Sequence, residues 1–237
     1  MKNIIKSLLE KFKTCKAREN SGYYLTLSKG NKKLKSNNRV AFLIWNLPAV
    51  ITCPFRTHLC GDVFCYALKA ERAYPTCKPS RLKHLEQSKQ DEFVLKMIFT
   101  IETELARPCN KGKKVVFRIH ESGDFYSLAY AQKWLAIADY FKDDQRIVFV
   151  AYTKSVAFFD GVKLPANFCL LASVWADTTE KNLAIIKRNN FRIYTAYKGA
   201  ELDNALKNGF TKCRCDNCAG CGLCWNNYVS NIACEIH

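Results

Sequence analysis

Short apolar stretches alternate along the chain with longer segments in which apolar residues recur every three or four positions. The short stretches predict buried strands over residues 40–49, 115–119, 147–152, 169–173 and 191–196. The periodic segments predict helices from residue 79 to about residue 106, over 127–141 and over 178–188, the last of them capped by Asp177 or Thr178. Strands that alternate with helices indicate an α/β fold with a parallel sheet.

The number and order of the predicted strands favour a partial (β/α) barrel, with an open doubly wound sheet as the alternative. In either fold, the C-terminal ends of the strands meet at one edge, where ligands bind. The composition changes near residue 40 and near residue 211. We therefore expect a basic N-terminal helix and leader (1–39), an α/β partial-barrel domain (40–210) and a cysteine-rich metal-binding tail (211–237).

The first residues of the chain predict an amphipathic helix with a basic outer face. Its apolar positions recur at helical spacing, at Ile4, Ile5, Leu8, Leu9 and Phe12. Packing on the body of the protein is the favoured interpretation of this helix, and a membrane-surface or partner helix is the alternative. Lysines interrupt the apolar core that a signal peptide needs, and no apolar stretch approaches the roughly 18 residues of a membrane span. We therefore expect a cytoplasmic protein with no membrane partner.

The chain is strongly basic, with 37 Lys and Arg residues against 21 Asp and Glu residues and a formal net charge of +16. Residues 1–40 hold eleven of the cations and two of the acids. A second basic group is Lys111, Lys113, Lys114 and Arg118. This excess of cations favours a polyanionic partner such as a nucleic acid, or a nucleotide. A solubilising surface is the alternative.

Thirteen cysteines, an odd number, fit metal binding in a reducing cytoplasm better than a framework of disulfides. The tail carries four of them with the spacing C-x2-C-x2-C-x2-C, at Cys215, Cys218, Cys221 and Cys224. This run resembles that of bacterial ferredoxins, without the proline that follows it there. A [4Fe-4S] cluster is the favoured occupant and zinc is the alternative, with Cys213 and Cys234 as substitute ligands.

A second group of cysteines, Cys53, Cys60 and Cys65, lies in the loop that follows the first predicted strand. Three thiolates leave one coordination position of a metal open, which is typical of sites that carry out chemistry. His58 is an alternative fourth ligand, although a histidine in such a loop is more often held by ordinary hydrogen bonds. Buried cysteines without a metal are the remaining interpretation.

Polar residues follow the next two strands at the same expected edge. After the second strand, His120, Glu121 and Asp124 are candidate acid–base or substrate-contact residues. The alternative is that Asp124 and Ser122 only hydrogen-bond the local turn. After the third strand, Lys154 is a candidate catalytic partner for a carboxylate or phosphate, with a solvated lysine as the alternative. The residues expected to contact a cofactor are Ser122, Gly123, Asp124, Tyr152 and Ser173.

The order of these features resembles the radical S-adenosylmethionine (SAM) superfamily. There, three cysteines after the first strand hold a [4Fe-4S] cluster, SAM chelates the open iron, and a Gly-Gly-Glu-like turn after the second strand contacts the methionine end of SAM. The resemblance implies that Cys53, Cys60 and Cys65 are the cluster ligands and that residues 122–124 form the turn. Their cysteine spacing is C-x6-C-x4-C, where the superfamily commonly has C-x3-C-x2-C. The resemblance also implies an electron donor such as a ferredoxin or a flavodoxin.

A closer resemblance covers most of the chain, from about residue 20 to residue 225. The phrases NLPA, TCP, CYALKAERAYP, RIHESGDFYS, AYTKS and CGLCW occur in this order and are similar to the phage gene-product-88 family. The resemblance implies an origin in a phage or prophage, and hence the cytoplasm of the bacterial host. It implies no particular reaction.

The favoured function is an iron–sulfur, radical-SAM-like enzyme that acts on a nucleic acid or a nucleotide. Its reactive cluster lies at the first three cysteines, and an auxiliary cluster lies in the tail. Three alternatives stay open: a zinc-stabilised protein that binds nucleic acid, a protein that acts on host machinery, and an iron–sulfur redox or electron-transfer protein that does not use SAM. The identity of the metal and a test of SAM binding separate these classes.

Overall fold

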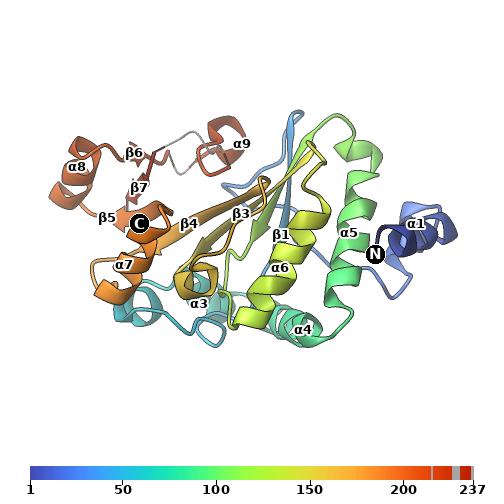
Figure 1. Cartoon of the computed structure of the whole chain (residues 1–237), viewed down its shortest axis with the longest axis horizontal. Coiled ribbons are helices and arrows are strands. Elements are labelled where there is room, and N and C mark those ends of the chain that lie inside the picture. The colour runs from blue at the N-terminus through green and yellow to red at the C-terminus, as the bar shows by residue number, and fades with distance from the viewer. Residues whose placement is uncertain (215, 226–229, 236–237) are drawn as a thin grey trace.

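A computed structural model describes residues 1–214, 216–225 and 230–235 of the chain (Figure 1). Within these residues, seven strands lie in the order β1-β2-β3-β4-β5-β7-β6, and each neighbouring pair is parallel. The sheet curls into a half-barrel, which confirms the predicted α/β fold with a parallel, partly closed sheet. The strands are β1 Val40–Trp45, β2 Lys114–Ile119, β3 Ile147–Thr153, β4 Phe168–Val174, β5 Arg192–Tyr197, β6 Thr211–Lys212 and β7 Ile232–Glu235.

Helices connect and flank the strands. They are α1 Lys2–Lys11, α2 Cys15–Glu19, α3 Tyr66–Ala73, α4 Cys77–Lys89, α5 Phe93–Leu105, α6 Leu128–Tyr140, α7 Glu180–Arg188, α8 Ala200–Lys207 and α9 Cys218–Cys221. A π-helical turn spans Leu59–Val63, and 3-10 turns span Pro108–Asn110 and Val156–Phe159. Connections through helices are what parallel strands require, since the chain must return to the same edge before each new strand.

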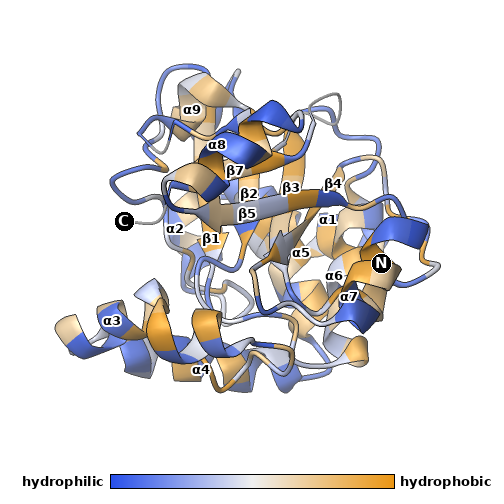
Figure 2. Cartoon of the chain, turned by 90° about the vertical axis from the view of Figure 1, so that its left-hand side faces the viewer, coloured by the Kyte–Doolittle hydropathy of each residue, from blue (hydrophilic) through white to orange (hydrophobic). Residues whose placement is uncertain are grey.

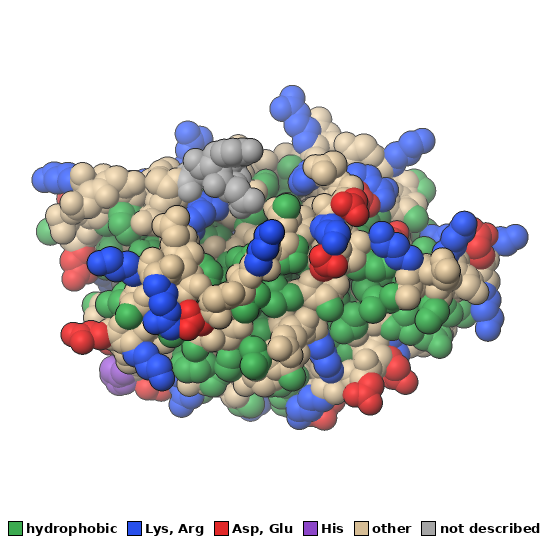
Figure 3. Space-filling model, in the orientation of Figure 1, with side chains coloured by type: hydrophobic (Ala, Val, Ile, Leu, Met, Phe, Trp, Pro, Cys, Tyr) green, Lys and Arg blue, Asp and Glu red, His purple; other side chains and the backbone are tan. Residues whose placement is uncertain are grey.

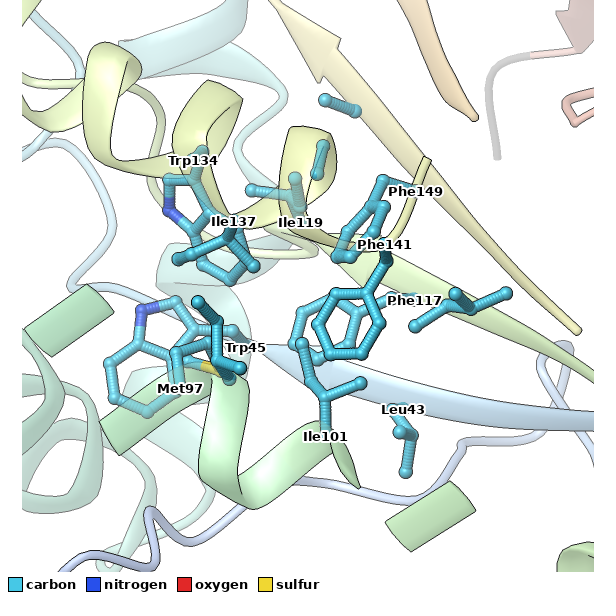
Figure 4. Packing of buried hydrophobic residues seen from close by; sticks show 14 of the residues in the cluster. Leu43, Trp45, Met97, Ile101, Phe117, Ile119, Trp134, Ile137, Phe141 and Phe149 are labelled. Atoms are coloured by element: carbon cyan, nitrogen blue, oxygen red, sulfur yellow. The ribbon is translucent and has the colours of Figure 1, made fainter. Parts of the chain in front are cut away.

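The helix-covered side of the sheet, called here the outer face, holds the main core. Trp45 of β1, Phe117 of β2 and Phe149 of β3 point toward α5 and α6 (Figure 4). The ring centroid of Phe117 lies 5.3 Å from that of Trp134 on α6. That of Trp45 lies 5.6 Å from that of Phe93 on α5. Aromatic packing of this kind buries large areas of apolar surface and dominates the stability of a core.

The N-terminal segment packs on the same core. Ile5 of α1 is fully buried in it, and Leu8 and Phe12 pack against it. The prediction that this helix packs on the body of the protein is therefore confirmed. Farther along the leader, Ser28 forms an antiparallel bridge to Ile44, with hydrogen bonds of 3.0 and 2.8 Å in the two directions.

Lys and Arg side chains are spread over the face shown in Figure 3, with Asp and Glu side chains among them, rather than gathered in one patch. The large net charge is thus distributed, at least over this side of the molecule. No helix in residues 1–214, 216–225 and 230–235 has both the length and the apolar character needed to span a membrane.

The opposite side of the sheet, called here the inner face, is covered by the tail. Phe42, Val116 and Val150 are buried there against Leu223 and Trp225. The ring centroids of Phe42 and Trp225 are 5.7 Å apart, in an edge-to-face arrangement. The cysteine-rich segment is therefore part of the packing of the sheet and not an appendage to it.

Several short elements and one break in a helix were not predicted. The segment predicted as one helix over 79–106 is two helices, because Gln90 between α4 and α5 is extended (φ −63°, ψ 147°). Strands β6 and β7 and helix α8 are short and lack a clear apolar pattern. Helix α8 carries both apolar and polar positions (Figure 2), and it packs Leu202 and Ala205 on Ala233 of β7.

The cap of α7 also differs from the prediction. The helix begins after Thr179, whose hydroxyl accepts a hydrogen bond from the backbone of the first turn. The two predicted caps bind elsewhere: Asp177 accepts a hydrogen bond from the N–H of Leu59 at 2.8 Å, and Thr178 accepts one from the N–H of Trp175 at 2.8 Å. Asp177 does not cap the helix, so its carboxylate can hydrogen-bond the loop that carries Cys60. This bond ties the end of β4 to that loop.

Candidate functional site

The C-terminal ends of β1, β2, β3 and β4 surround one cavity of about 150 Å³, called here the mouth. The loop after β1 supplies the thiols of Cys53, Cys60 and Cys65. The residues predicted for acid–base chemistry or cofactor contact also line the cavity, namely His120, Glu121, Ser122, Gly123, Asp124, Tyr152, Lys154 and Ser173. The structure thus brings the first cysteine group and the predicted acid–base and cofactor residues together, while their roles stay predictions.

The loop after β1 is latched to the turn after β2. The side-chain oxygen of Asn46 accepts hydrogen bonds from the N–H groups of Glu121 and Ser122, at 2.8 and 3.1 Å. The N–H of Leu47 donates to the carbonyl of Ser122 at 2.9 Å. The ring of His84 on α4 lies 2.9 Å from the carbonyl of Asn46. One asparagine therefore sets the position of both segments that form the mouth.

Cys60 lies in the π-helical turn Leu59–Val63, a rare element that recurs at functional sites. The turn is held from the far side of the mouth by the carboxylate of Asp177. Next to it, the rings of Phe64 and Trp175 are stacked, with centroids 5.6 Å apart and planes at 13°. The cysteine loop is thus fixed against the end of β4 by one polar and one aromatic contact.

Burial dominates the electrostatics of the thiols in the mouth. Burial, with a smaller contribution from the nearby carboxylate of Asp124, raises the pKa of Cys53 to about 12. Burial also raises the pKa of Cys60, although the ammonium of Lys154, which hydrogen-bonds to it, opposes this. Both thiols are therefore protonated at neutral pH, and a metal that bound them would release protons.

The described residues contain no group of three or more His, Cys, Asp or Glu side chains arranged to hold a metal ion. A single tetrahedral zinc would need sulfurs about 3.8 Å apart, since each Zn–S bond is about 2.3 Å. In a four-iron cluster each thiolate binds a different iron. The cysteine sulfurs around such a cluster therefore lie farther apart than those around a single zinc ion. His58 does not line the mouth: its exposed ring pairs with Asp62 at 3.1 Å, as expected of an ordinary loop residue.

Asp124 and Lys154 form the floor of the mouth. The buried carboxylate of Asp124 accepts hydrogen bonds from the hydroxyl of Thr153 at 2.6 Å and from the N–H groups of Phe125 and Lys154 at 2.7 and 2.9 Å. Burial raises the pKa of this carboxyl. The ammonium of Lys154 donates to the hydroxyl of Ser173 at 2.9 Å. Asp124 is thus fully engaged in joining two loops, whereas Lys154 presents a cation to the cavity.

The side chains of His120 and Glu121 are both in contact with neighbouring residues. His120 adopts a left-handed backbone conformation (φ 65°), and its Nε2 lies 2.9 Å from the hydroxyl of Tyr130. Its ring also packs on that of Phe125, with centroids 4.9 Å apart. The carboxylate of Glu121 accepts a hydrogen bond from the side chain of Asn31 in the leader. Both residues therefore shape the turn that carries Ser122 and Gly123.

Arg118 was missed as a site residue. Its guanidinium lies over the ring of Tyr152, 3.5 Å from the centroid, and its Nε donates to the carbonyl of His120 at 3.0 Å. The signal in the sequence was a single cation within an otherwise apolar strand, since such a residue must find a partner when the strand is buried. Arg118 lines the mouth from the inner face of β2.

The tail cysteines lie apart from the mouth. Cys218, Cys221 and Cys224 line a second, smaller cavity together with Cys213. Cys215 lies outside the described residues, so its predicted role as a ligand stays a prediction. Cys234 is buried in β7.

Gly123 offers a first test of how the mouth is built. Its φ is +80°, and an added Cβ would lie 2.4 Å from the hydroxyl of Thr52 and 2.7 Å from the Cβ of Leu47. We expect Gly123→Ala to lower the free energy of unfolding by about 2–4 kcal/mol in urea titrations. Gly112, with a φ of +74° and no atom within 4 Å of an added Cβ, is the matched control. Gly112→Ala should cost about 1–2 kcal/mol, and equal losses would refute the close approach.

His120 offers a second test. Burial, together with the smaller effect of the charge of Arg118, lowers its pKa from 6.5 to about 3. Between these values the unfolded chain binds a proton that the folded protein does not, so stability falls as the pH drops below about 6.5. The expected contribution is about 1.4 kcal/mol per pH unit.

The variant His120→Asn removes the titrating group and keeps a residue that tolerates positive φ. Urea unfolding of both proteins between about pH 7 and pH 5 should give a shallower pH dependence for the variant. Parallel curves would show that His120 is not the neutral, buried group described above.

Comparisons with known proteins agree with the resemblance seen in the sequence. Residues 25–227 match the model of a family described as Gene product 88. The chain is 27% identical to the Gene 88 protein of Mycobacterium phage D29 over 198 residues, which are 76% of this chain and 80% of that protein. It is 28% identical to the Gene 88 protein of Mycobacterium phage L5 over 106 residues, 44% of this chain and 43% of that protein. No solved structure matches the chain. Because the family match spans most of the sequence, the chain belongs to the gene product 88 family.

Proposed function

We propose that the protein is a radical-SAM-like iron–sulfur enzyme whose reactive [4Fe-4S] cluster is held by Cys53, Cys60 and Cys65. One observation carries the proposal: three thiols from one loop face a single cavity at the C-terminal ends of parallel strands. Three thiolates leave one iron of a cluster open to a further ligand. When bound, such a cluster supplies the electron for reductive cleavage of SAM, and it takes that electron from a donor such as a ferredoxin or flavodoxin.

The walls of the mouth fit a small ligand with a carboxylate and hydroxyl groups. Lys154 and Ser173 offer a cation and a hydroxyl from β3 and β4. The buried hydroxyl of Ser122 has no hydrogen-bond partner among the described residues, which leaves it for a ligand. Gly123 instead serves the close approach to Leu47, and Asp124 is occupied by its three donors. Direct contacts to SAM therefore fall to Ser122, Lys154 and Ser173 in this proposal.

We propose a nucleotide, rather than a long nucleic acid, as the substrate class. Arg56, Arg118 and Lys154 all line the mouth, so an anionic group would meet three cations there. The surface cations are dispersed on the face shown in Figure 3, whereas a polymer would be gripped by a continuous basic stripe. The relatives from two mycobacteriophages support an origin in a phage or prophage. The cytoplasm of the host is the proposed compartment.

The test is anaerobic reconstitution of the protein with iron and sulfide. On a two-cluster model we expect about eight irons per chain, and a paramagnetic resonance spectrum of the reduced protein that shifts when SAM is added. Cys60→Ala should remove about half of the iron and abolish the response to SAM. Cys109→Ala, which removes an exposed thiol outside both cavities, is the control and should keep both.

Each other outcome points to one of the alternative functions. Iron without a SAM shift would favour a redox or electron-transfer protein. Zinc in place of iron would favour a zinc-stabilised protein that binds nucleic acid or host machinery. Unchanged iron in Cys60→Ala would overturn the assignment of the mouth.

A further inference from the structure

Two side chains in the turn after β2 carry buried polar atoms without a partner. His120 is 3% exposed and Ser122 is 2% exposed, and both residues line the mouth. The Nδ1 of His120 and the hydroxyl of Ser122 have no hydrogen-bond partner in the part of the chain that the structure describes. Because an unpaired buried polar group is costly, two such atoms in one turn indicate a bound ligand that supplies the missing hydrogen bonds.

The backbone of this turn is set without any ligand. The side-chain oxygen of Asn46 accepts hydrogen bonds from the N–H groups of Glu121 and Ser122. His120 adopts a left-handed conformation with a φ of 65°. The backbone here favours glycine or asparagine, so the presence of histidine reflects what its ring binds.

The hydroxyl of Tyr130 on α6 determines which ring nitrogen of His120 carries the proton. It lies 2.9 Å from Nε2, and Tyr130 is 1% exposed. Burial raises the pKa of this phenol well above its ordinary value, so the phenol is protonated at neutral pH. The indole groups of Trp134 and Trp45 oppose this rise in pKa, but an indole N–H can only donate a hydrogen bond. Nε2 of His120 is therefore the acceptor that the proton of Tyr130 needs.

A neutral imidazole that accepts at Nε2 carries its own proton on Nδ1. The ring of His120 is neutral at neutral pH, because burial lowers its pKa to about 3. Its Nδ1–H is then a donor without an acceptor. The hydroxyl of Ser122 is a second unpaired donor, two residues farther along the same turn.

A buried cation lies on the next strand of the mouth. Lys154 is 9% exposed, and its ammonium donates a hydrogen bond to the hydroxyl of Ser173 at 2.9 Å. The carboxylate of Asp124 lies on the floor of the mouth, but it already accepts three hydrogen bonds from other groups. Two neutral donors and one buried cation around a single cavity match an oxyanion, which accepts hydrogen bonds and carries the opposite charge.

We propose that His120 and Ser122 donate hydrogen bonds to an oxyanion bound in the mouth, beside the ammonium of Lys154. Tyr130 is the positioning residue, because it keeps His120 in the form that carries its proton on Nδ1. His120 is thus a hydrogen-bond donor to the ligand and not an acid–base catalyst. The oxyanion is the carboxylate of SAM or the phosphate of a nucleotide, so the choice of probes rests on the function proposed above. The donors themselves need no metal.

The test compares three probes that share adenosine. S-adenosylhomocysteine adds a carboxylate, adenosine 5′-phosphate adds a phosphate, and adenosine adds neither. In calorimetric titrations of the full-length protein, we expect one or both anionic probes to bind at least about tenfold more tightly than adenosine. Which of the two does so tells a carboxylate site from a phosphate site.

Variants of the two donors test which groups hold the anion. Ser122→Ala and His120→Gly should each weaken the anionic probe about tenfold and leave adenosine unchanged. His120→Asn should keep the affinity within about threefold, because its amide N–H replaces the Nδ1–H donor and asparagine tolerates a positive φ. Glycine fits the same backbone, so the pair separates the loss of the donor from strain in the turn.

Tyr130→Phe tests the positioning role. It should weaken the anionic probe by about threefold or more, since the proton of His120 can then move to Nε2. In the His120→Asn background the same change should have no effect, because an amide has no second tautomer. Tyr126→Phe is the matched control: its ring stacks on that of Tyr130 with centroids 4.5 Å apart, its hydroxyl pairs with Ser88 at 3.0 Å, and it does not line the mouth. This control should bind the probe as the wild type does.

The proposal fails if neither anionic probe binds more tightly than adenosine, if Ser122→Ala and His120→Gly bind that probe as the wild type does, or if Tyr126→Phe and Tyr130→Phe weaken it equally. Circular dichroism reports whether each variant folds, and Ser122→Ala decides alone if His120→Gly does not. The titrations are run with and without reconstituted iron and sulfide. Iron content and the SAM response decide the proposed function separately, so a protein without a cluster that binds an anionic probe in this way refutes only that function.

Discussion

The structure depends on covering both faces of a parallel sheet that does not close into a full barrel. Such a sheet is apolar on its two sides, and each side must be removed from water. Helices α1, α5 and α6 cover the outer face, while the inner face is left to the tail, through Leu223 and Trp225. A segment this short cannot build a core of its own. The cysteines of the tail therefore lie in a segment that packs on the face of the sheet that lacks a helix.

The same sheet sets the positions of the loops that form the mouth. Parallel strands in chain order bring the loops after β1, β2, β3 and β4 to one edge, and the latch through Asn46 and the pairing of Asp177 with the cysteine loop keep them in place. Most of the polar groups there are already satisfied by each other. The side chains left to face the cavity are thiols, cations and hydroxyls. Fewer groups are therefore available to a ligand than the full set of lining residues indicates.

The five long strands were predictable from their continuous apolar runs. The edge that carries the site was predictable because helices between the strands indicate a parallel sheet, in which the C-terminal ends of the strands meet at one edge. The roles of single residues were not. A histidine after a strand looks like a catalyst in the sequence, whereas only the structure shows that burial lowers the pKa of His120 and that its Nε2 meets the hydroxyl of Tyr130 on α6. Likewise, the pairing of β6 with β7, which no apolar pattern predicts, brings Cys213 to the tail cavity, where the spacing offered it only as a substitute ligand.

One side chain belongs to both cavities. The ring of Tyr152 lines the mouth, while its hydroxyl donates to the sulfur of Cys224 in the tail. Arg118 lies over that ring and lines the mouth, and its charge acts on the tail thiols of Cys218 and Cys224. The two cysteine groups, far apart in the sequence, are thus joined through one tyrosine and one arginine on the inner face. A substitution at Tyr152 or Arg118 therefore changes the lining of the mouth and the surroundings of Cys224 together.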